Sequence, residues 1–125
     1  MDMKLELIPL PVSDVSRSKG FSVDALDFPL DHDVEPGNGM RIVEVTPPGS
    51  ACSTAFGTGM TRPDAGPVHG IHLVVDDIAA VRRGLRARGV DIGAIRDLDG
   101  VAYASFSDPD GNTWELPSLR GPRVS

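Results

Sequence analysis

An internal repeat constrains the fold of this chain more than any other feature of its sequence. An apolar segment that runs into a helix-capping sequence occurs twice, as LPVSDV at 10–15 and LVVDDI at 73–78. A turn sequence also occurs twice, as TPPG at 46–49 and DPDG at 108–111. The two features lie 37 positions apart in the first copy (49 − 12) and 36 in the second (111 − 75). Matched features in the same order and at nearly the same spacing indicate a duplicated unit.

The first copy predicts a strand, a helix and three further strands. Residues 4–12 form the first strand, and Ser13 or Asp14 can cap the helix by accepting backbone N–H bonds. The helix is expected to continue through Gly20 to about Leu26, although glycine and several serines are poor helix formers. The three remaining strands are expected at 28–34, 39–46 and 51–56.

The second copy repeats this order more clearly. After a strand at 70–75, Asp76 is expected to cap a helix that ends at Gly89. Ile78, Val81 and Leu85 form an apolar stripe at helical spacing along it. Strands are then predicted at 91–96, 100–107 and 112–117, with hairpin turns at 97–100 and 108–111.

The repeat predicts an α+β fold. Two tandem βαβββ modules, 3–56 and 69–118, would be joined by a Gly/Pro-rich linker at 57–68 and followed by a tail at 119–125. The whole chain, 1–125, would form a single domain. One helix covers only one face of a four-stranded sheet, so the two sheets are expected to curl into a curved mixed sheet around a concave, ligand-binding pocket.

Composition excludes several classes of function. The net charge is −6, and the arginines at 82–88 lie on a predicted amphipathic helix, so no nucleic-acid partner is expected. No apolar run reaches the ~20 residues that cross a membrane, and the N-terminus lacks a secretory signal, which predicts a cytoplasmic protein. Cys52 is the single cysteine and has no cationic neighbours in sequence, so an inert core thiol is expected. Ten of the twelve basic residues are arginine, a bias typical of GC-rich bacterial genomes.

Four segments resemble the vicinal oxygen chelate superfamily, which includes glyoxalases, bleomycin resistance proteins and extradiol dioxygenases. They are LPVSDV at 10–15, TPPGSACS at 46–53, HLVVDDI at 72–78 and SDPDGNTWEL at 107–116, the last being the most specific. The resemblance spans nearly the whole chain and implies two βαβββ modules, a small-molecule ligand and a homodimer. It does not by itself imply a reaction, because function depends on the site rather than the fold.

Metal-dependent relatives take one ligand from the first strand and one from the last strand of each half. Carried over by the family's spacing, the four positions are Leu7, Ser53, Gly70 and Glu115. Leucine and glycine have no side-chain donor and a serine hydroxyl is a poor ligand, so a single carboxylate remains. We therefore expect no cofactor. If a divalent metal binds at all, His72 and Glu115 would be its ligands, with His32 as a further candidate.

Glu115 and His72 are also the candidate catalytic residues, because a carboxylate and an imidazole can form an acid–base couple. Trp114 is expected to face away from Glu115 and to pack under a helix. His32 is expected to face away from Asp31 and Asp33 on a solvated edge strand. The predicted ligand-binding residues line the expected pocket: Leu7, Ser53, Ala55, Phe56, His72, Ala104, Phe106 and Glu115.

These observations favour a glyoxalase/bleomycin-resistance-like protein that binds a small hydrophobic or aromatic metabolite or antibiotic without a divalent metal. One alternative is a lyase, isomerase or dioxygenase-like enzyme that uses Glu115 and His72 as acid and base or as a displaced metal site. A further alternative is a non-catalytic accessory domain. The sequence leaves open whether the protein is an enzyme.

Overall fold

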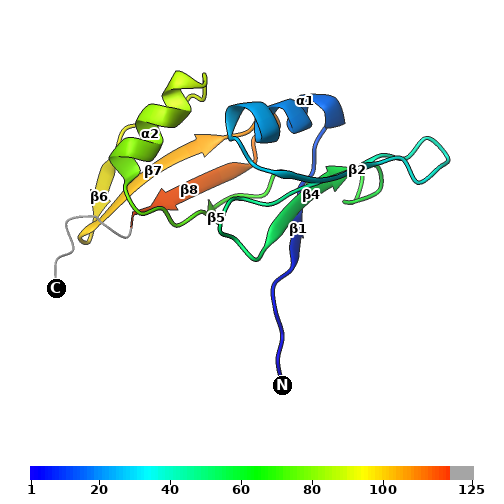
Figure 1. Cartoon of the computed structure of the whole chain (residues 1–125), viewed down its shortest axis with the longest axis horizontal. Helices are drawn as coiled ribbons and strands as arrows, with labels where there is room; N and C mark the ends of the chain where they lie inside the picture. Colours follow the sequence, from blue (N-terminus) through cyan, green and yellow to red (C-terminus); the bar gives the residue numbers. More distant parts are fainter. Residues whose placement is uncertain (119–125) are drawn as a thin grey trace. The chain divides into compact units, whose positions relative to one another are not determined.

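The computed structural model describes residues 1–118, so the predicted tail at 119–125 lies outside the described residues. The chain forms two compact units, Met1–Pro67 and the part from Val68 onward. Each unit contains a four-stranded mixed sheet and a helix, which confirms the α+β class and the two βαβββ modules (Figure 1). The curved sheet and pocket shared by the two modules stay a prediction. Neither helix within residues 1–118 has the length and apolar content needed to span a membrane.

The first unit follows the predicted order with shorter strands. Its sheet has the order β1-β4-β3-β2, in which β1 is parallel to β4 and the other neighbours are antiparallel. The elements are β1 (Leu7–Pro9), α1 (Val15–Gly20), a π-helical turn η1 (Phe21–Ala25), β2 (Leu30–Val34), β3 (Ile42–Val45) and β4 (Ser53–Gly57).

The first helix begins where the sequence predicts. Asp14 has an extended backbone, and its carboxylate accepts a hydrogen bond from Arg17 N at 3.0 Å. This bond satisfies one of the free N–H groups at the helix start. The helix passes through Gly20 and widens into the π-helical turn η1, which ends at Leu26 as expected.

The helix covers one face of the first sheet (Figure 1). The side chains on this face form the core of the unit, and Val43, Val45 and Phe56 are at most 1% exposed. Phe56 pairs with Val43 across β3 and β4. The opposite face, which we call the open face of this sheet, carries Leu7 and Ala55.

An ion-pair network ties α1 to β2 and β3. Asp33 accepts hydrogen bonds from Lys19 Nζ at 2.6 Å and from Arg41 Nε at 3.0 Å and Nη2 at 2.9 Å. Arg41 Nη1 also donates to Ser16 Oγ on α1 at 2.6 Å. The hydrogen bonds from Arg41 and then Lys19 hold the pKa of the Asp33 carboxyl far below its usual range.

This network makes a pH-dependent contribution to stability. A carboxylate whose pKa is lower in the folded state stabilises the fold above its unfolded pKa of about 3.9, and this stabilisation is lost as the pH falls further. We expect Asp33→Asn to lower the melting temperature at pH 7, and the difference from the wild type to shrink below about pH 4. Thermal unfolding of both proteins from neutral to acidic pH measures this. A constant difference across the range would show that the ion pairs add no stability.

The second unit has the same architecture. Its sheet has the order β5-β8-β7-β6, with β5 parallel to β8 and the other neighbours antiparallel. The elements are β5 (Ile71–His72), α2 (Ile78–Ala87), β6 (Arg96–Leu98), β7 (Val101–Ser107) and β8 (Thr113–Pro117).

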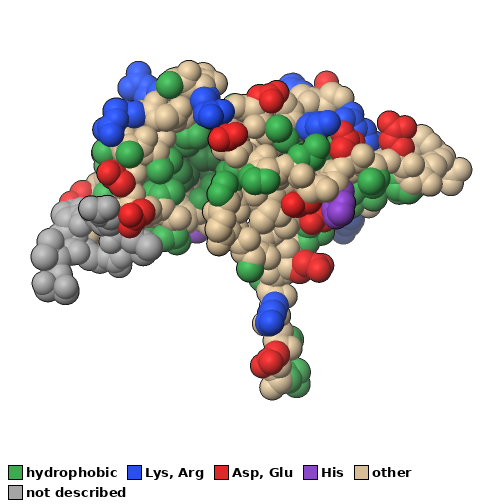
Figure 2. All heavy atoms as spheres, viewed as in Figure 1, with side chains coloured by type: hydrophobic (Ala, Val, Ile, Leu, Met, Phe, Trp, Pro, Cys, Tyr) green, Lys and Arg blue, Asp and Glu red, His purple; other side chains and the backbone are tan. Residues whose placement is uncertain are grey.

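The second helix begins one residue later than predicted. Asp77, rather than Asp76, is the capping residue, and its carboxylate accepts from Ala79 N and Ala80 N. The extended backbone that a cap requires belongs to Asp77, as it does to Asp14 in the first unit. The helix ends at Gly89 as expected, with a φ of +88°. Its basic side chains gather on the outer side, in line with a solvated helix face (Figure 2).

The prediction for the β6–β7 hairpin was partly wrong. Residues 91–95 are not a strand, and β6 instead includes Leu98, which pairs with Val101. The turn is therefore the two-residue sequence Asp99-Gly100, in which both residues have a positive φ (52° and 82°). Asp-Gly is the sequence that such a tight hairpin favours.

The turn between β7 and β8 is fixed by side chains. Asp108 Oδ1 accepts from Asp110 N and Asn112 N, each at 2.9 Å, and Gly111 has a φ of +86°. The fully buried Asn112 donates from Nδ2 to Asp108 Oδ2 at 2.8 Å and accepts from Val68 N at 2.8 Å. This asparagine therefore joins the turn to the segment that leads into β5.

Candidate functional site

The faces of the second sheet differ in burial. Even-numbered residues of β7 and β8 lie under α2, including Ala104 (0% exposed), Trp114 (2%) and Phe106 (4%). The Phe106 and Trp114 rings stack with their centroids 5.9 Å apart. Odd-numbered residues, including Tyr103, Ser105 and Glu115, lie on the other face and are half-buried. We call this second face the open face of the sheet, and it confirms that Trp114 and Glu115 point to opposite sides.

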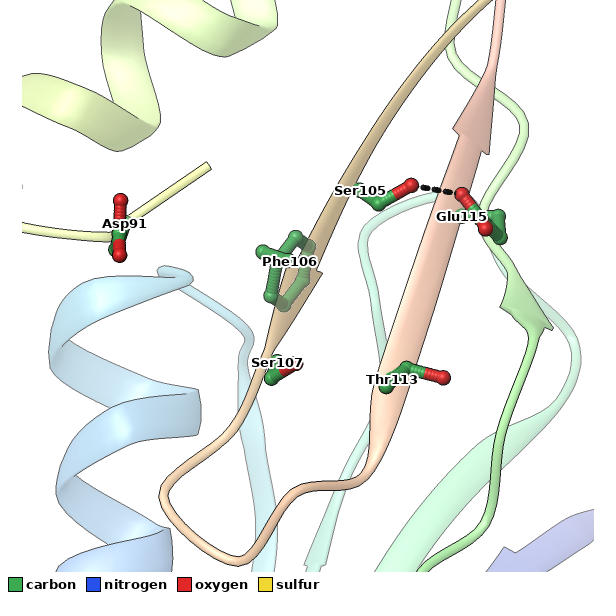
Figure 3. Close-up of a pocket in the computed structure, with 6 residues that line it drawn as sticks. All are labelled: Asp91, Ser105, Phe106, Ser107, Thr113 and Glu115. Carbon is green, nitrogen blue, oxygen red and sulfur yellow. Dashed lines mark hydrogen bonds between the residues drawn. The ribbon is translucent and has the colours of Figure 1, made fainter. Parts of the chain in front are cut away.

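An open hollow of about 360 Å³ lies at the end of β7 and the start of β8, and residues from both faces of the sheet line it. Two carboxylates, three hydroxyls and one aromatic residue line it: Asp91, Ser105, Phe106, Ser107, Thr113 and Glu115 (Figure 3). The neighbouring strands β7 and β8 supply five of the six, and Asp91 comes from the segment after α2. The predicted contacts Glu115 and Phe106 are thus found together.

Glu115 is already engaged by two neighbours. Ser105 and Glu115 turn toward each other from adjacent strands, and the Ser105 hydroxyl donates to Glu115 Oε2 (Figure 3). Arg96 Nη2 donates to Ser105 Oγ at 2.8 Å and forms an ion pair with Glu115 Oε2 at 3.3 Å. The charge of the carboxylate is therefore balanced by a guanidinium of the same sheet.

His72 lies beside Glu115 in the parallel ladder of β5 and β8. Paired residues in a ladder share a face, so His72 is on the open face, as the sequence suggested. Its Nδ1 lies 2.7 Å from Gly70 O. A carbonyl only accepts, so Nδ1 carries the hydrogen of this bond. Acid–base chemistry by this pair stays a prediction.

Gly70 occupies a different place from the one that the family's spacing suggests. It precedes β5, has a φ of +78°, and its N–H donates to Thr113 Oγ1 at 2.8 Å. In the first unit the two expected ligand positions, Leu7 and Ser53, pair directly. In the second unit the partner of Glu115 is His72, so the register assigns His72 rather than Gly70 to the position that corresponds to Leu7.

The open face of the first sheet carries a second polar chain. Ser53, which is 8% exposed, shares a hydrogen bond of 2.6 Å with Thr46 Oγ1, and Thr46 donates to the Asp31 carboxylate. A bulge between Leu30 and His32 lets Asp31 reach this face. The expectation that His32 faces away from Asp31 was therefore wrong, because a bulge breaks the alternation of side chains. Its placement on an edge strand is confirmed.

These donors do not fit the divalent metal that catalytic relatives hold. Leu7 offers no donor atom, the Ser53 hydroxyl is bonded to Thr46, and Glu115 is paired with Arg96. Within residues 1–118, no three His, Cys, Asp or Glu side chains are arranged to hold a metal ion. A divalent site needs several oxygen, nitrogen or sulfur ligands around one point, and neither sheet supplies them.

The remaining predicted ligand contacts divide between the faces of their sheets. Leu7, Ser53 and Ala55 lie on the open face of the first sheet, where Leu7 is half-buried and Ser53 and Ala55 are 8% and 1% exposed. Phe56 and Ala104 lie on the helix-covered faces and are 1% and 0% exposed. Contact between these side chains and a ligand stays a prediction.

Sequence reasoning missed Arg96, Ser105 and Asp91. A signal for Arg96 was present in the Asp99-Gly100 pair, because a two-residue turn there pairs Arg96 with Tyr103. Tyr103 is two residues from Ser105, so the correct turn would have placed Arg96 near Ser105. No local pattern marks Asp91, which belongs to an irregular segment.

Comparison with known proteins identifies the family. Residues 4–116 match the Glyoxalase/Bleomycin resistance protein/Dioxygenase superfamily, and the chain belongs to it. This confirms the resemblance drawn from the sequence motifs. No curated protein matched the chain significantly.

Several solved structures resemble the chain over almost its whole length. An antibiotic binding protein, TnmS3, from a Streptomyces species is 31% identical, with a TM-score of 0.81 over 94% of this chain and 96% of that one. A glyoxalase/bleomycin resistance protein from a Streptomyces species is 32% identical, with a TM-score of 0.77 over 92% and 100%. A member of the superfamily from Sphaerobacter thermophilus is 30% identical, with a TM-score of 0.80 over 94% and 98%.

Proposed function

We propose that this protein binds a small hydrophobic or aromatic metabolite or antibiotic, and that it does so without a divalent metal. The observation that carries the proposal is the set of side chains at the positions where metal-dependent relatives have their ligands. Leu7 has no donor, and Glu115 is held by Arg96 and Ser105. Such positions suit contact with an organic ligand better than coordination of a metal.

Two further observations support a ligand of this class. The open face of the second sheet presents half-buried Val101, Tyr103 and Pro117, which offer apolar and aromatic surface beside the polar hollow. In addition, one structural relative, 31% identical, is an antibiotic binding protein. Homodimer formation, implied by the family resemblance, stays a prediction that light scattering of the purified protein can check.

The first test is metal content and metal response. We expect protein purified without added metal to contain no stoichiometric metal by elemental analysis. We also expect nickel, manganese, iron and zinc to leave its melting temperature unchanged. Tight stoichiometric metal, or a large rise in melting temperature with one metal, would contradict the metal-independent proposal.

The same melting assay then tests ligand binding. A ligand present at 100 times its Kd stabilises a fold by about 2.7 kcal/mol, which raises the melting temperature of a domain of this size by roughly 10 °C. We expect at least one member of a panel of aromatic and peptide antibiotics to produce such a rise. If no compound of the panel shifts the melting temperature, the proposed binding function loses its support.

A further inference from the structure

On the open face of the second sheet, the hydrogen bonds fix which polar groups donate and which accept. Glu115 is a carboxylate and can only accept hydrogen bonds. The single hydroxyl hydrogen of Ser105 is donated to Glu115 Oε2. Ser105 Oγ in turn accepts from Arg96 Nη2 at 2.8 Å. Toward any further group, Ser105 and Glu115 therefore offer lone pairs and no hydrogen.

The chain on the first open face has the same property. Thr46 donates its only hydroxyl hydrogen to the Asp31 carboxylate, so the hydrogen in its bond with Ser53 must come from Ser53. Ser53 Oγ is then also left with lone pairs alone. In both sheets a carboxylate fixes the direction of the hydrogen bonds, and the residue at the family's last-strand ligand position becomes an acceptor.

The hollow in the second unit also carries a net negative charge. Its other carboxylate, Asp91, is exposed and also accepts only. Arg96 balances Glu115, while Asp91 forms no ion pair within residues 1–118, so the three groups together carry one net negative charge. The Ser107 hydroxyl can rotate and suits a donor or an acceptor, whereas Thr113 Oγ1 already accepts from Gly70 N at 2.8 Å and lies 3.4 Å from His69 Nδ1.

We infer that the hollow beside Glu115 binds its ligand through a hydrogen-bond donor of that ligand, a hydroxyl or a protonated amine, which donates to Glu115 Oε1. This inference rests on the proposed function, because it names the chemistry of the small molecule bound. Oε1 makes no hydrogen bond within residues 1–118, whereas Oε2 is used by Ser105 and Arg96. A ligand that brings only acceptor oxygens would face the lone pairs of Glu115 and Ser105 and would be disfavoured beside this carboxylate.

The test uses two probes that differ in one donated hydrogen, 2-naphthalenemethanol and its methyl ether. Amide NMR titrations of the whole protein measure the Kd of each and show which residues respond. We expect the alcohol to bind at least about tenfold more tightly, since hydrogen bonds to charged groups are stronger than those between neutral groups. We also expect the signals of Thr113 and Glu115 to shift. Equal affinities, or no binding of either probe, would overturn the inference.

Two charged probes with the same ring distinguish the kinds of donor. 2-Naphthalenemethylamine, protonated at neutral pH, is expected to bind as tightly as the alcohol or more tightly, and 2-naphthoate, which only accepts, more weakly than either. A naphthoate affinity equal to that of the alcohol would contradict binding through donation to Glu115 Oε1. These probes test the inference separately from the proposed function. A positive antibiotic panel with no preference for the alcohol would leave the function standing and the inference refuted.

A matched pair of variants locates the preference. Glu115→Gln removes the charge, and we expect the advantage of the alcohol over its ether to fall below about threefold, because bonds between neutral groups are weaker. Glu35→Gln makes the same change at an exposed residue outside the hollow and should keep the full preference. A preference that survives in Glu115→Gln would overturn the role of this carboxylate. If that variant does not fold, the comparison of alcohol and ether on the wild-type protein still decides the inference.

Discussion

Replacing Phe56 by alanine should lower the free energy of unfolding by about 3–5 kcal/mol, the usual cost of removing a buried phenylalanine. Its ring is 1% exposed on the helix-covered face of the first sheet, opposite the fully buried Val43. The substitution leaves a cavity between α1 and the sheet that the surrounding backbone can fill only in part. A small domain has only about 5–15 kcal/mol of stability, so the loss is a large fraction of the total.

Urea unfolding of Phe56→Ala and Phe56→Leu measures this effect. Leucine keeps much of the apolar volume, so its midpoint should lie between those of the wild type and the alanine variant. If Phe56 were instead a ligand contact, as predicted from the sequence, Phe56→Ala would behave differently. It would keep wild-type stability and bind an antibiotic from the panel more weakly. An unchanged urea midpoint in Phe56→Ala would therefore contradict the core role.

The repeat was sufficient to predict the fold because each of its features has a local physical cause. Asp14 and Gly89 mark a helix start and a helix end through capping and a left-handed backbone, which are properties of single residues. The order of helices and strands follows from these residues at the helix ends and from the strand patterns between them. Errors arose where two neighbours could play one role, as with Asp76 and Asp77, since sequence does not show which backbone is extended.

The candidate site was predicted less well because it depends on strand register. Counting along the chain assigned Gly70 to the family's position, whereas the ladder places His72 opposite Glu115. Register is set by pairing between segments more than 40 residues apart and by irregularities such as the bulge beside Asp31. The ion pair between Glu115 and Arg96 could not be predicted from the sequence for a similar reason. Arg96 reaches Glu115 across a hairpin whose turn had been predicted to begin at residue 97, two residues too early.

The two networks show how the residues at the family's ligand positions are held in this chain. Glu115 keeps the family's position, but Arg96 supplies the positive charge beside it. A guanidinium neutralises a carboxylate without offering open coordination positions, so it cannot polarise a substrate as a bound metal would. What remains is a fixed array of acceptors on a sheet, which suits recognition of a ligand.

Replacing Asn112 by alanine should cost about 2–4 kcal/mol, because it leaves two groups without the partner that the asparagine supplies. Val68 N loses its acceptor, and Asp108 Oδ2 loses the Nδ2 donor. The asparagine is fully buried, so water does not reach its place in the intact fold. Since Thr113 and Glu115 follow directly in β8, their amide NMR signals should also shift, which ties this turn to the geometry of the hollow.

Asn112→Asp separates the two hydrogen bonds. The aspartate keeps an acceptor for Val68 N but places a second carboxylate beside Asp108, and like charges at this distance raise the pKa of the pair. A carboxyl whose pKa is raised in the folded state destabilises the fold at neutral pH, and this penalty is lost as the pH falls. The deficit of Asn112→Asp in urea unfolding should thus be largest at pH 7 and shrink toward about pH 4, whereas that of Asn112→Ala should change little. A deficit of Asn112→Asp that does not change with pH would show that the side chains of Asn112 and Asp108 are not in contact, and the turn would then depend on Gly111 and on the bonds that Asp108 Oδ1 accepts from Asp110 N and Asn112 N.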